Sequence, residues 1–267
     1  MVKCWEHHSQ RFPILQPPNC KQPIKVSFII PAFNEETLLG ETLTSVIDEV
    51  ERTLCTCEVL VVDNASTDST AQLAKTFRGV RVITEPVRSL VKARQSGFVA
   101  ARGELLANID ADTKLPAGWL KRALDEFEGR PRLVALSGPF VYYDLNQCIG
   151  ILVRLFYCTG YLLCMSAKFF FCKWGMLQGG NFVVRRRALA RIGGYRKEFE
   201  FYGEDTDLAC QLCTVGEVRF SFDLWAWSSG RRLNQEGVVR SGLRYAMNHL
   251  WTAALGKPFT RTWTNVR

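Results

Sequence analysis

The sequence predicts an α/β fold in which helices flank a single, mostly parallel central sheet. Short β-branched, apolar runs bounded by turn residues alternate with longer segments whose apolar residues recur at helical spacing. Alternation at this interval implies right-handed βαβ units, which build parallel sheets. The chain has 267 residues, of which 47% are hydrophobic, and this is enough for one large domain with its own core.

The first half of the chain shows the alternation most clearly. Strands are expected at 25–30, 58–62, 80–84 and 104–109, and helices at 37–54, 68–77 and 89–101. Pro31 bounds the first strand, and Ser66 and Thr67 are suitable caps for the second helix. These four strands should lie side by side with their carboxyl ends at one edge.

The second half is more irregular. Helices are expected at 116–128, 185–192 and 208–214, strands at 133–138 and 218–222, the latter as the final strand, and a glycine turn at 179–180. The segment 148–174 is strongly apolar, but only 13 uncharged residues separate Arg154 from Lys168. A spanning helix needs about 20 apolar residues. We therefore expect this segment to lie on a membrane, to roof an apolar acceptor pocket or to pack as a core or interface helix.

Composition narrows the class of partner. The formal net charge of +8 favours an anionic partner such as nucleotide phosphates or lipid headgroups, and no recognised nucleic-acid-binding motif accompanies it. From 228 to 267 there are seven Lys or Arg against Glu236 alone. The ten cysteines and the absence of an apolar stretch at the start favour a reducing, cytoplasmic compartment. We expect an irregular lead-in at 1–23, one domain at 24–232 and a basic helical tail at 233–267.

Two aspartates follow the fourth expected strand directly. Asp110 and Asp112 are two residues apart, so they would share one face if the strand continued. Ligands of parallel α/β sheets bind at this edge, and paired carboxylates suit Mg²⁺ or Mn²⁺ when phosphates complete the shell. An Asp-rich turn with only structural hydrogen bonds is the alternative.

A second acidic pair opens a helix. Glu204 and Asp205 lie at the expected helix start, where the helix dipole favours a charged carboxylate, and either could act as a general base toward a hydroxyl. Asp63, at the end of the second strand, could accept hydrogen bonds from a nucleobase or ribose.

Together these motifs closely resemble family 2 glycosyltransferases of the GT-A fold, over about residues 25–232. The matching segments are Ile30-Pro-Ala-Phe-Asn-Glu35, Val61-Val-Asp-Asn-Ala-Ser-Thr-Asp68, Lys92-Ala-Arg-Gln-Ser-Gly97, Asp110-Ala-Asp112, Gly180-Asn-Phe182 with Arg186, and Glu204-Asp-Thr-Asp-Leu208. The resemblance implies an enzyme that moves one sugar from a nucleotide diphosphate sugar to an acceptor hydroxyl, with inversion and with Mg²⁺ or Mn²⁺. Residues 24–113 would form the donor half and residues 114–232 the acceptor half.

The resemblance also implies roles for individual residues. Asp205 would be the base, Glu204 would orient the acceptor or the base, and Asp112 would bind the metal. The donor would be held by Pro31, Ala32, Phe33, Glu35, Asp63, Lys92, Arg94, Asp110, Ala111, Arg231 and Arg232, and the acceptor by Trp174, Gly180 and Asn181. A lipid-linked acceptor and peripheral contact with the inner face of the cell membrane are hypotheses that rest on 148–174 and on the basic tail.

The chain departs from the family pattern in two places. Asn64 stands where many members have a second Asp, so any role of that carboxylate is lost. The Gln-x-x-Arg-Trp signature of processive polysaccharide synthases is missing, which favours addition of a single sugar. The alternatives are a retaining transferase on the same fold, a sugar-phosphate nucleotidyltransferase, for which the glycine-rich loop is lacking, and a non-catalytic membrane-surface binding protein.

Overall fold

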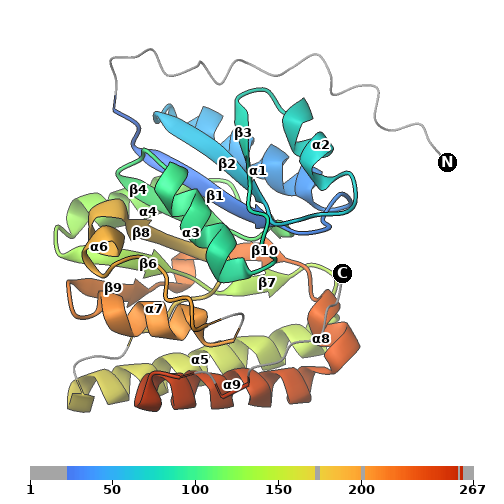
Figure 1. The fold of residues 1–267 in the computed structure, drawn as a ribbon. Coiled ribbons are helices and arrows are strands. Elements are labelled where there is room, and N and C mark those ends of the chain that lie inside the picture. Colours follow the sequence, from blue (N-terminus) through green and yellow to red (C-terminus); the bar gives the residue numbers. More distant parts are fainter. Residues whose placement is uncertain (1–22, 172–174, 200–201, 258, 261–267) are drawn as a thin grey trace.

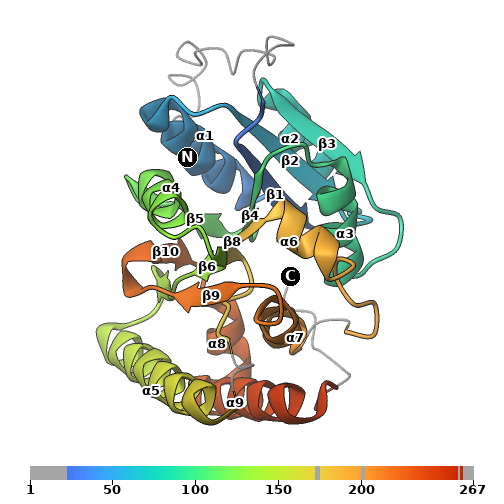
Figure 2. The ribbon, with the colours of Figure 1, turned by 90° about the vertical axis from the view of Figure 1, so that its left-hand side faces the viewer.

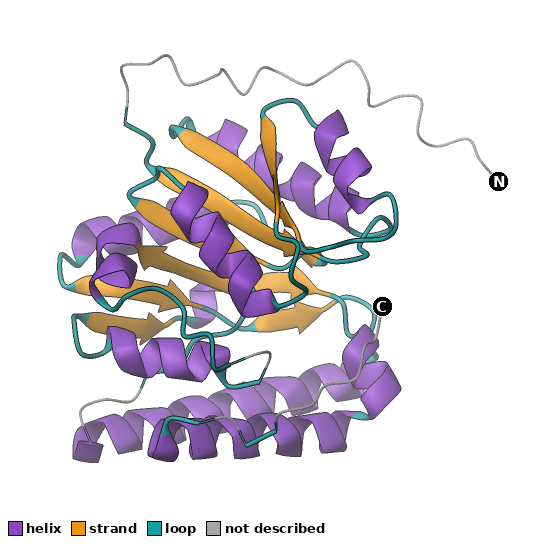
Figure 3. Cartoon of the chain, in the orientation of Figure 1, coloured by secondary structure: helices purple, strands orange, loops and turns teal. Residues whose placement is uncertain are grey.

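Seven strands form the central sheet, in the order β3-β2-β1-β4-β8-β6-β9 (Figures 1 and 3). The computed structural model describes residues 23–171, 175–199, 202–257 and 259–260. The strands are β1 (Val26–Ala32), β2 (Cys57–Asp63), β3 (Val80–Thr84), β4 (Leu105–Ile109), β6 (Leu133–Ser137), β8 (Asn181–Arg185) and β9 (Glu217–Phe220). Every neighbouring pair is parallel except the two that β8 makes with β4 and β6. The predicted mostly parallel sheet is therefore confirmed.

Helices cover both faces of this sheet because its strand residues alternate between two apolar cores. On one face Phe28 and Ile30 of β1 pack with α1 (Leu39–Thr53), α2 (Thr70–Thr76) and α4 (Trp119–Gly129). On the other face Ile29 packs with α3 (Leu90–Ala100), α6 (Arg186–Arg191) and α7 (Glu204–Leu212). Because both faces are buried, the strands are almost continuously apolar, which is why the sequence shows them so clearly.

Two features of the sheet region differ from the expectation. The glycine turn at 179–180 leads into β8, an antiparallel strand that the sequence analysis did not predict. The strand at 218–222 is not the last one: β10 (Ala226–Ser228) follows it and joins β5 (Thr113–Lys114) and β7 (Phe140–Tyr142) in a second, three-stranded sheet. Strands of two or three residues are too short to show any periodicity.

A layer of helices lies below the sheet in Figure 1. It contains α5 (Gln147–Phe171), α8 (Arg231–Glu236) and α9 (Val238–Leu255). The turned view in Figure 2 also places α5 beside α9, with α7 between α9 and the sheet. Within the described residues, α5 alone is long and apolar enough to cross a membrane by length and composition. The predicted apolar helical insertion is thus present as one continuous helix.

A buried carboxylate joins α1 to α4. Glu49 has no exposed surface, and its carboxylate accepts hydrogen bonds from the backbone N–H groups of Gly118 and Leu120, both at 3.0 Å. It therefore caps the first turn of α4, where backbone N–H groups have no partner within the helix. In this way α1 fixes the helix that follows the Asp110–Asp112 turn.

We expect Glu49→Ala to lower the free energy of unfolding by about 2–4 kcal/mol, because two backbone donors lose their acceptor inside the protein. Urea unfolding followed by circular dichroism measures the change. Glu51→Ala, an exposed position on the same helix, is the control and should shift stability by less than about 0.5 kcal/mol. Equal effects of the two substitutions would contradict the capping role.

Candidate active site

The carboxyl ends of β1, β2 and β4 bring the donor-side residues to one rim of the sheet. In the parallel register Ala32 lies opposite Asp63, and β4 lies on the other side of β1. Asp63 is buried at the end of β2, and Asp110 follows directly after β4. The structure thus brings together residues that are almost 50 positions apart in the sequence.

The loops after β1 and β2 are interlocked. Asn34 adopts a positive φ of 51°, a conformation that Asn tolerates better than most residues, and its side chain accepts a hydrogen bond from the Thr67 N–H at 2.9 Å. Its own N–H donates to Ser66 Oγ at 3.1 Å. Asp63 Oδ1 accepts from the Ser66 N–H at 3.2 Å, so both loops hold the Asp63 carboxylate in place.

Asn64 and Arg88 were not among the predicted site residues. The Asn64 amide donates to the carbonyls of Glu85 and Val87 and accepts from the Ser89 N–H at 2.8 Å, so it holds the segment that leads into α3. An Asp here could not donate these bonds. The segment places the Arg88 guanidinium 4.1 Å from the centre of the Phe33 ring, a cation–π contact. The departure from the family pattern at Asn64 was the available signal.

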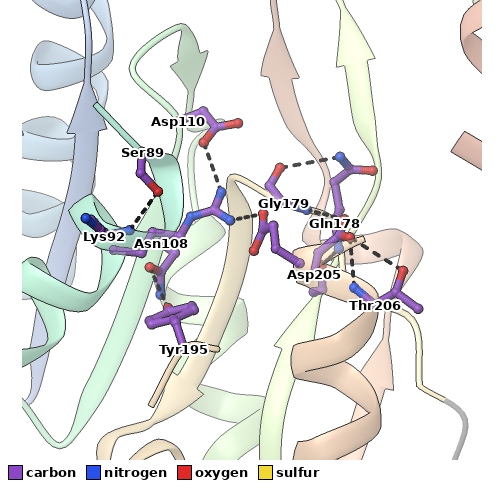
Figure 4. A network of polar contacts seen from close by, with 12 residues as sticks. Ser89, Lys92, Asn108, Asp110, Gln178, Gly179, Tyr195, Asp205 and Thr206 are labelled. Atoms are coloured by element: carbon purple, nitrogen blue, oxygen red, sulfur yellow. Dashed lines mark hydrogen bonds and ion pairs between the residues drawn. The ribbon is translucent and has the colours of Figure 1, made fainter. Parts of the chain in front are cut away.

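Arg94 lies in the middle of the site and is almost completely buried, at 1% exposure. Its guanidinium donates to Glu204 of α7 and to Asp110 at 3.3 Å (Figure 4). Sequence analysis expected Arg94 to contact the donor base or phosphates. The structure instead places it beneath the rim, where it joins the donor strand to the helix that carries the predicted base.

Burial and charge work against each other in this pair. Burial raises the pKa of Glu204 to about 7, although Arg94 opposes this shift. Burial would lower the pKa of Arg94, but Glu204 and Asp110 outweigh it and raise that pKa. Glu204 Oε2 and Arg94 Nε are buried without a hydrogen-bond partner. The ion pair is therefore only partly compensated, and either partner alone would be costly to bury.

Two glycines let β8 approach the two acidic motifs. Gly180 has a φ of +81°, and a Cβ there would lie 2.1 Å from the Asp110 carboxylate. The Gly179 N–H donates to Asp205 Oδ2 at 3.2 Å, and the Thr206 N–H donates to Asp205 Oδ1 at 2.8 Å (Figure 4). Asp110 and Asp205 therefore lie on either side of one backbone turn.

Arg231 contacts Asp112, the carboxylate that was predicted to bind the metal. Its guanidinium donates to Asp112 Oδ2 at 3.0 Å and to Glu35, which follows β1. Burial would lower the pKa of Arg231, but its hydrogen bonds to these carboxylates outweigh burial and raise it. Arg232, predicted beside it, instead pairs with Glu236 at 3.3 Å. Arg231 therefore lies at the acidic rim.

The other predicted residues are placed less directly. Asn181 was expected to bind the acceptor, but its side chain is fully buried, accepts from Trp119 Nε1 at 3.1 Å and donates to the Leu224 carbonyl at 2.8 Å, so it has a structural role. Pro31, Ala32 and Ala111 are buried at the strand ends, and Lys92 is half-buried at the start of α3. Trp174 lies outside the described residues.

The residues at the rim fit a divalent cation only when a bound substrate supplies further oxygen ligands. Among the described residues, no group of three or more His, Cys, Asp or Glu could hold a metal ion. Mg²⁺ commonly uses one or two protein carboxylates and completes its shell with substrate phosphates and water. Asp112 already forms an ion pair with the Arg231 guanidinium. Its oxygen chemistry and its place at the rim suit that arrangement.

Comparison with known proteins gives matches of three kinds. The family model described as Glycosyl transferase family 2 matches residues 27–193. The chain is 28% identical over 219 residues to probable glycosyltransferase YdaM of Bacillus subtilis (strain 168), which covers 76% of this chain and 50% of YdaM. It is 27% identical over 150 residues to dodecaprenyl-phosphate galacturonate synthase of Rhizobium johnstonii, which covers 53% of this chain and 43% of that protein. The chain thus spans half or less of these two curated relatives.

A solved structure confirms the predicted GT-A fold. The mannosyltransferase PcManGT of Pyrobaculum calidifontis, in complex with GDP-Man and Mn²⁺, superposes with a TM-score of 0.58 at 21% identity. The superposition covers 89% of this chain and 68% of PcManGT.

Proposed function

Since this chain belongs to glycosyl transferase family 2, we propose that it transfers one sugar from a nucleotide diphosphate sugar to an acceptor hydroxyl, by a metal-dependent inverting displacement. The observation that carries the proposal is the buried Arg94 bridge. It ties Asp110 at the donor rim to Glu204, which is adjacent to Asp205 at the start of α7. An inverting transfer needs a donor site and a base held in fixed relation, and this bridge supplies that relation.

In this proposal residues 24–113 form the donor half. Asp63 and the Phe33–Arg88 pair stand where the nucleoside would bind, and Asp110 where the ribose would bind. Asp112 would hold Mg²⁺ or Mn²⁺, which stabilises the negative charge of the departing nucleoside diphosphate. Arg231 would exchange its contact with Asp112 for the diphosphate, because both are anionic partners for a guanidinium.

Residues 114–232 form the acceptor half in this proposal. Asp205 is the base: the Gly179 and Thr206 N–H groups orient its carboxylate at the start of α7, and α7 points its positive dipole end toward it. Asp205 would take the proton of the acceptor hydroxyl as that oxygen attacks the sugar. Glu204 is held by Arg94 and positions the helix start rather than the acceptor.

We propose a lipid-linked acceptor and a cytoplasmic location at a membrane. Two observations support the acceptor class: the apolar helix α5, and similarity to relatives named dodecaprenyl-phosphate galacturonate synthase and, in Trichomonas vaginalis, dolichyl-phosphate beta-glucosyltransferase. A retaining transferase would use the same donor rim, and NMR of the product's anomeric centre distinguishes the two. A retained configuration would remove Asp205 from the role of base.

The donor site is tested by thermal stabilisation, which needs no acceptor. We expect a nucleotide diphosphate sugar together with Mn²⁺ to raise the melting temperature of the protein, and a chelator to abolish the shift, because Asp112 would hold the metal that the donor needs. Asp112→Asn should weaken binding of nucleotide plus Mn²⁺ at least about tenfold in calorimetry. Asp125→Asn, which changes an acid on α4 that pairs with Lys121, is the control. Unchanged affinity of Asp112→Asn would place the metal elsewhere.

A further inference from the structure

Helix α9 has an inverted distribution of side chains. The residues that it buries against the body are polar: Ser241, Asn248 and Thr252. The apolar residues point outward, and seven of them are more than a third exposed: Val239, Leu243, Tyr245, Met247, Leu250, Trp251 and Leu255. At 3.6 residues per turn, Val239, Leu243, Met247 and Leu250 fall on the side opposite the buried polar residues, Trp251 lies at the flank, and Tyr245 and Leu255 lie nearer the buried side. A helix on a water-exposed surface normally shows the reverse pattern.

Helix α5, beside α9, also exposes an apolar side. Its Tyr157 and Cys164 are buried against the body, and the Tyr157 ring stacks on Phe220 with ring centroids 6.0 Å apart. The opposite side of the helix exposes large apolar side chains: Ile151, Leu152, Leu155, Phe156, Leu162, Leu163 and Met165. Of the 21 large apolar side chains that are exposed in the described part of the chain, these two helices carry 14.

The two segments also carry the whole excess of positive charge. By sequence, 145–174 and 237–267 hold eight of the 34 basic residues and none of the 26 acidic ones, so the remainder of the chain is balanced at 26 of each. Arg154 on α5 and Arg240 on α9 are exposed. An apolar surface whose exposed charged residues, Arg154 and Arg240, are basic is complementary to an anionic lipid surface, and two such surfaces would repel each other.

We propose that the outer faces of α5 and α9, here called the α5–α9 face, dock on the surface of an anionic phospholipid bilayer, with both helices lying in its plane. The length and composition of α5 would also permit a spanning helix. The contacts favour the planar arrangement, because Tyr157 donates a hydrogen bond to Gln178 at 2.7 Å and Tyr161 contacts both Phe220 and Phe222. A spanning helix would have to give up these contacts with the body.

The inner side of the same layer touches the candidate active site. Tyr157 of α5 holds Gln178, next to Gly179, whose N–H donates to Asp205. On α9, His249 Nδ1 lies 3.0 Å from the hydroxyl of Thr206, the residue after Asp205. Docking would therefore set the predicted base just above the lipid headgroups. This step rests on the proposed function and deepens it: the acceptor hydroxyl, on a lipid-borne phosphate or sugar, would reach Asp205 from the bilayer side.

The test is flotation of the purified chain with vesicles of phosphatidylcholine containing phosphatidylglycerol, and with vesicles of phosphatidylcholine alone. We expect binding to the anionic vesicles, weakened at least about tenfold in the neutral ones and in 0.5 M salt. The double variant Leu155→Glu/Leu250→Glu should bind at least about tenfold more weakly than wild type, because two apolar anchors become acidic. Val99→Glu, on an exposed apolar residue of α3, is the matched control and should change binding less than about twofold.

Fluorescence locates the docked face independently. Trp251 is 42% exposed on α9, so brominated phospholipids should quench emission in wild type, and Trp251→Phe should lose most of that quenching.

Equal vesicle binding by wild type and the double variant would overturn the proposal. So would extraction from membranes by detergent but not by salt or alkali, which indicates a spanning helix, or a lipid-free dimer that the double variant dissociates, which indicates a second copy on this face.

Failure of docking and failure of sugar transfer remain distinguishable. The double variant should keep its thermal stabilisation by nucleotide plus Mn²⁺, since neither substituted residue lies at the donor rim. Vesicle binding without any donor binding would support the docking surface and count against the proposed function. Donor binding without vesicle binding would support the proposed function and count against the docking surface.

Discussion

Asp205→Asn is expected to lower the rate of sugar transfer by about 10²-fold or more, the usual scale for loss of a general base, while donor affinity stays unchanged. The amide cannot take the proton of the acceptor hydroxyl, yet it can still accept a hydrogen bond from the Gly179 N–H. The donor contacts lie across the Gly179–Gly180 turn and should not be affected. Single-turnover kinetics measures the rate, and calorimetry with nucleotide plus Mn²⁺ measures donor binding.

Asp207→Asn is the matched control for this experiment. Asp207 lies on the same helical turn, but it accepts from Arg196 at 2.8 Å and from Gln211 at 2.6 Å, away from the rim. Its substitution should leave the transfer rate within about threefold, since it removes no group from the proposed chemistry. A near-normal rate for Asp205→Asn would exclude Asp205 as the base, and an equal loss in both variants would point to a disturbance of α7.

Arg94→Met is expected to lower the free energy of unfolding by about 3–5 kcal/mol, the usual cost of removing one partner of a buried ion pair. The substitution leaves Glu204, which is buried, without its cation. Chemical unfolding at fixed pH measures the loss. Arg81→Met, which breaks a pair at a side chain 45% exposed, should cost less than about 1 kcal/mol and serves as the control.

The loss should depend on pH in a defined direction. Burial already raises the pKa of Glu204 to about 7, and removal of Arg94 should raise it further. In the unfolded chain, glutamate loses its proton above a pKa of about 4.3. In the folded variant, Glu204 keeps its proton up to its raised pKa, so between these two pKa values the folded state binds one more proton than the unfolded state. Stability therefore falls as the pH rises, and the deficit relative to wild type should be larger at pH 8 than at pH 5.

A second substitution separates charge burial from loss of packing. Arg94→Met/Glu204→Gln should be more stable than Arg94→Met alone, because no buried carboxylate is left unpaired. If the double variant were less stable than the single one, the Arg94–Glu204 pair would not be the source of the loss.

Much of the fold could be predicted from short apolar runs. β1, β2 and β4 are buried on both faces, so their sequences are mostly apolar and stand out between helices. β8 has the same composition, but its direction depends on which strands it lies between, and local sequence does not encode a neighbour. β5, β7 and β10 are held by pairing with each other and have no pattern of their own.

Candidate site residues could be predicted where the residue type itself suggests a chemical role. Asp63, Asp110, Asp112, Glu204 and Asp205 could be proposed as site residues because each follows a strand or opens a helix, and their roles stay predictions. Arg94 and Asn181 were assigned to ligands, since a polar residue in a motif suggests contact with substrate. Their partners, Glu204 and Trp119, are distant in the sequence, so only the packed structure shows that both side chains are used internally.

By itself, the sequence determined the alternation of strands and helices, the family, and the acidic residues at the rim, because these depend on local composition and spacing. The tertiary structure decided which way each helix turns. α9 contains both polar and apolar residues, and only its packing against α5, α7 and α8 shows that Ser241, Asn248 and Thr252 are buried while large apolar side chains are exposed. Orientation is set by the partner against which a helix packs, and that partner lies elsewhere in the chain.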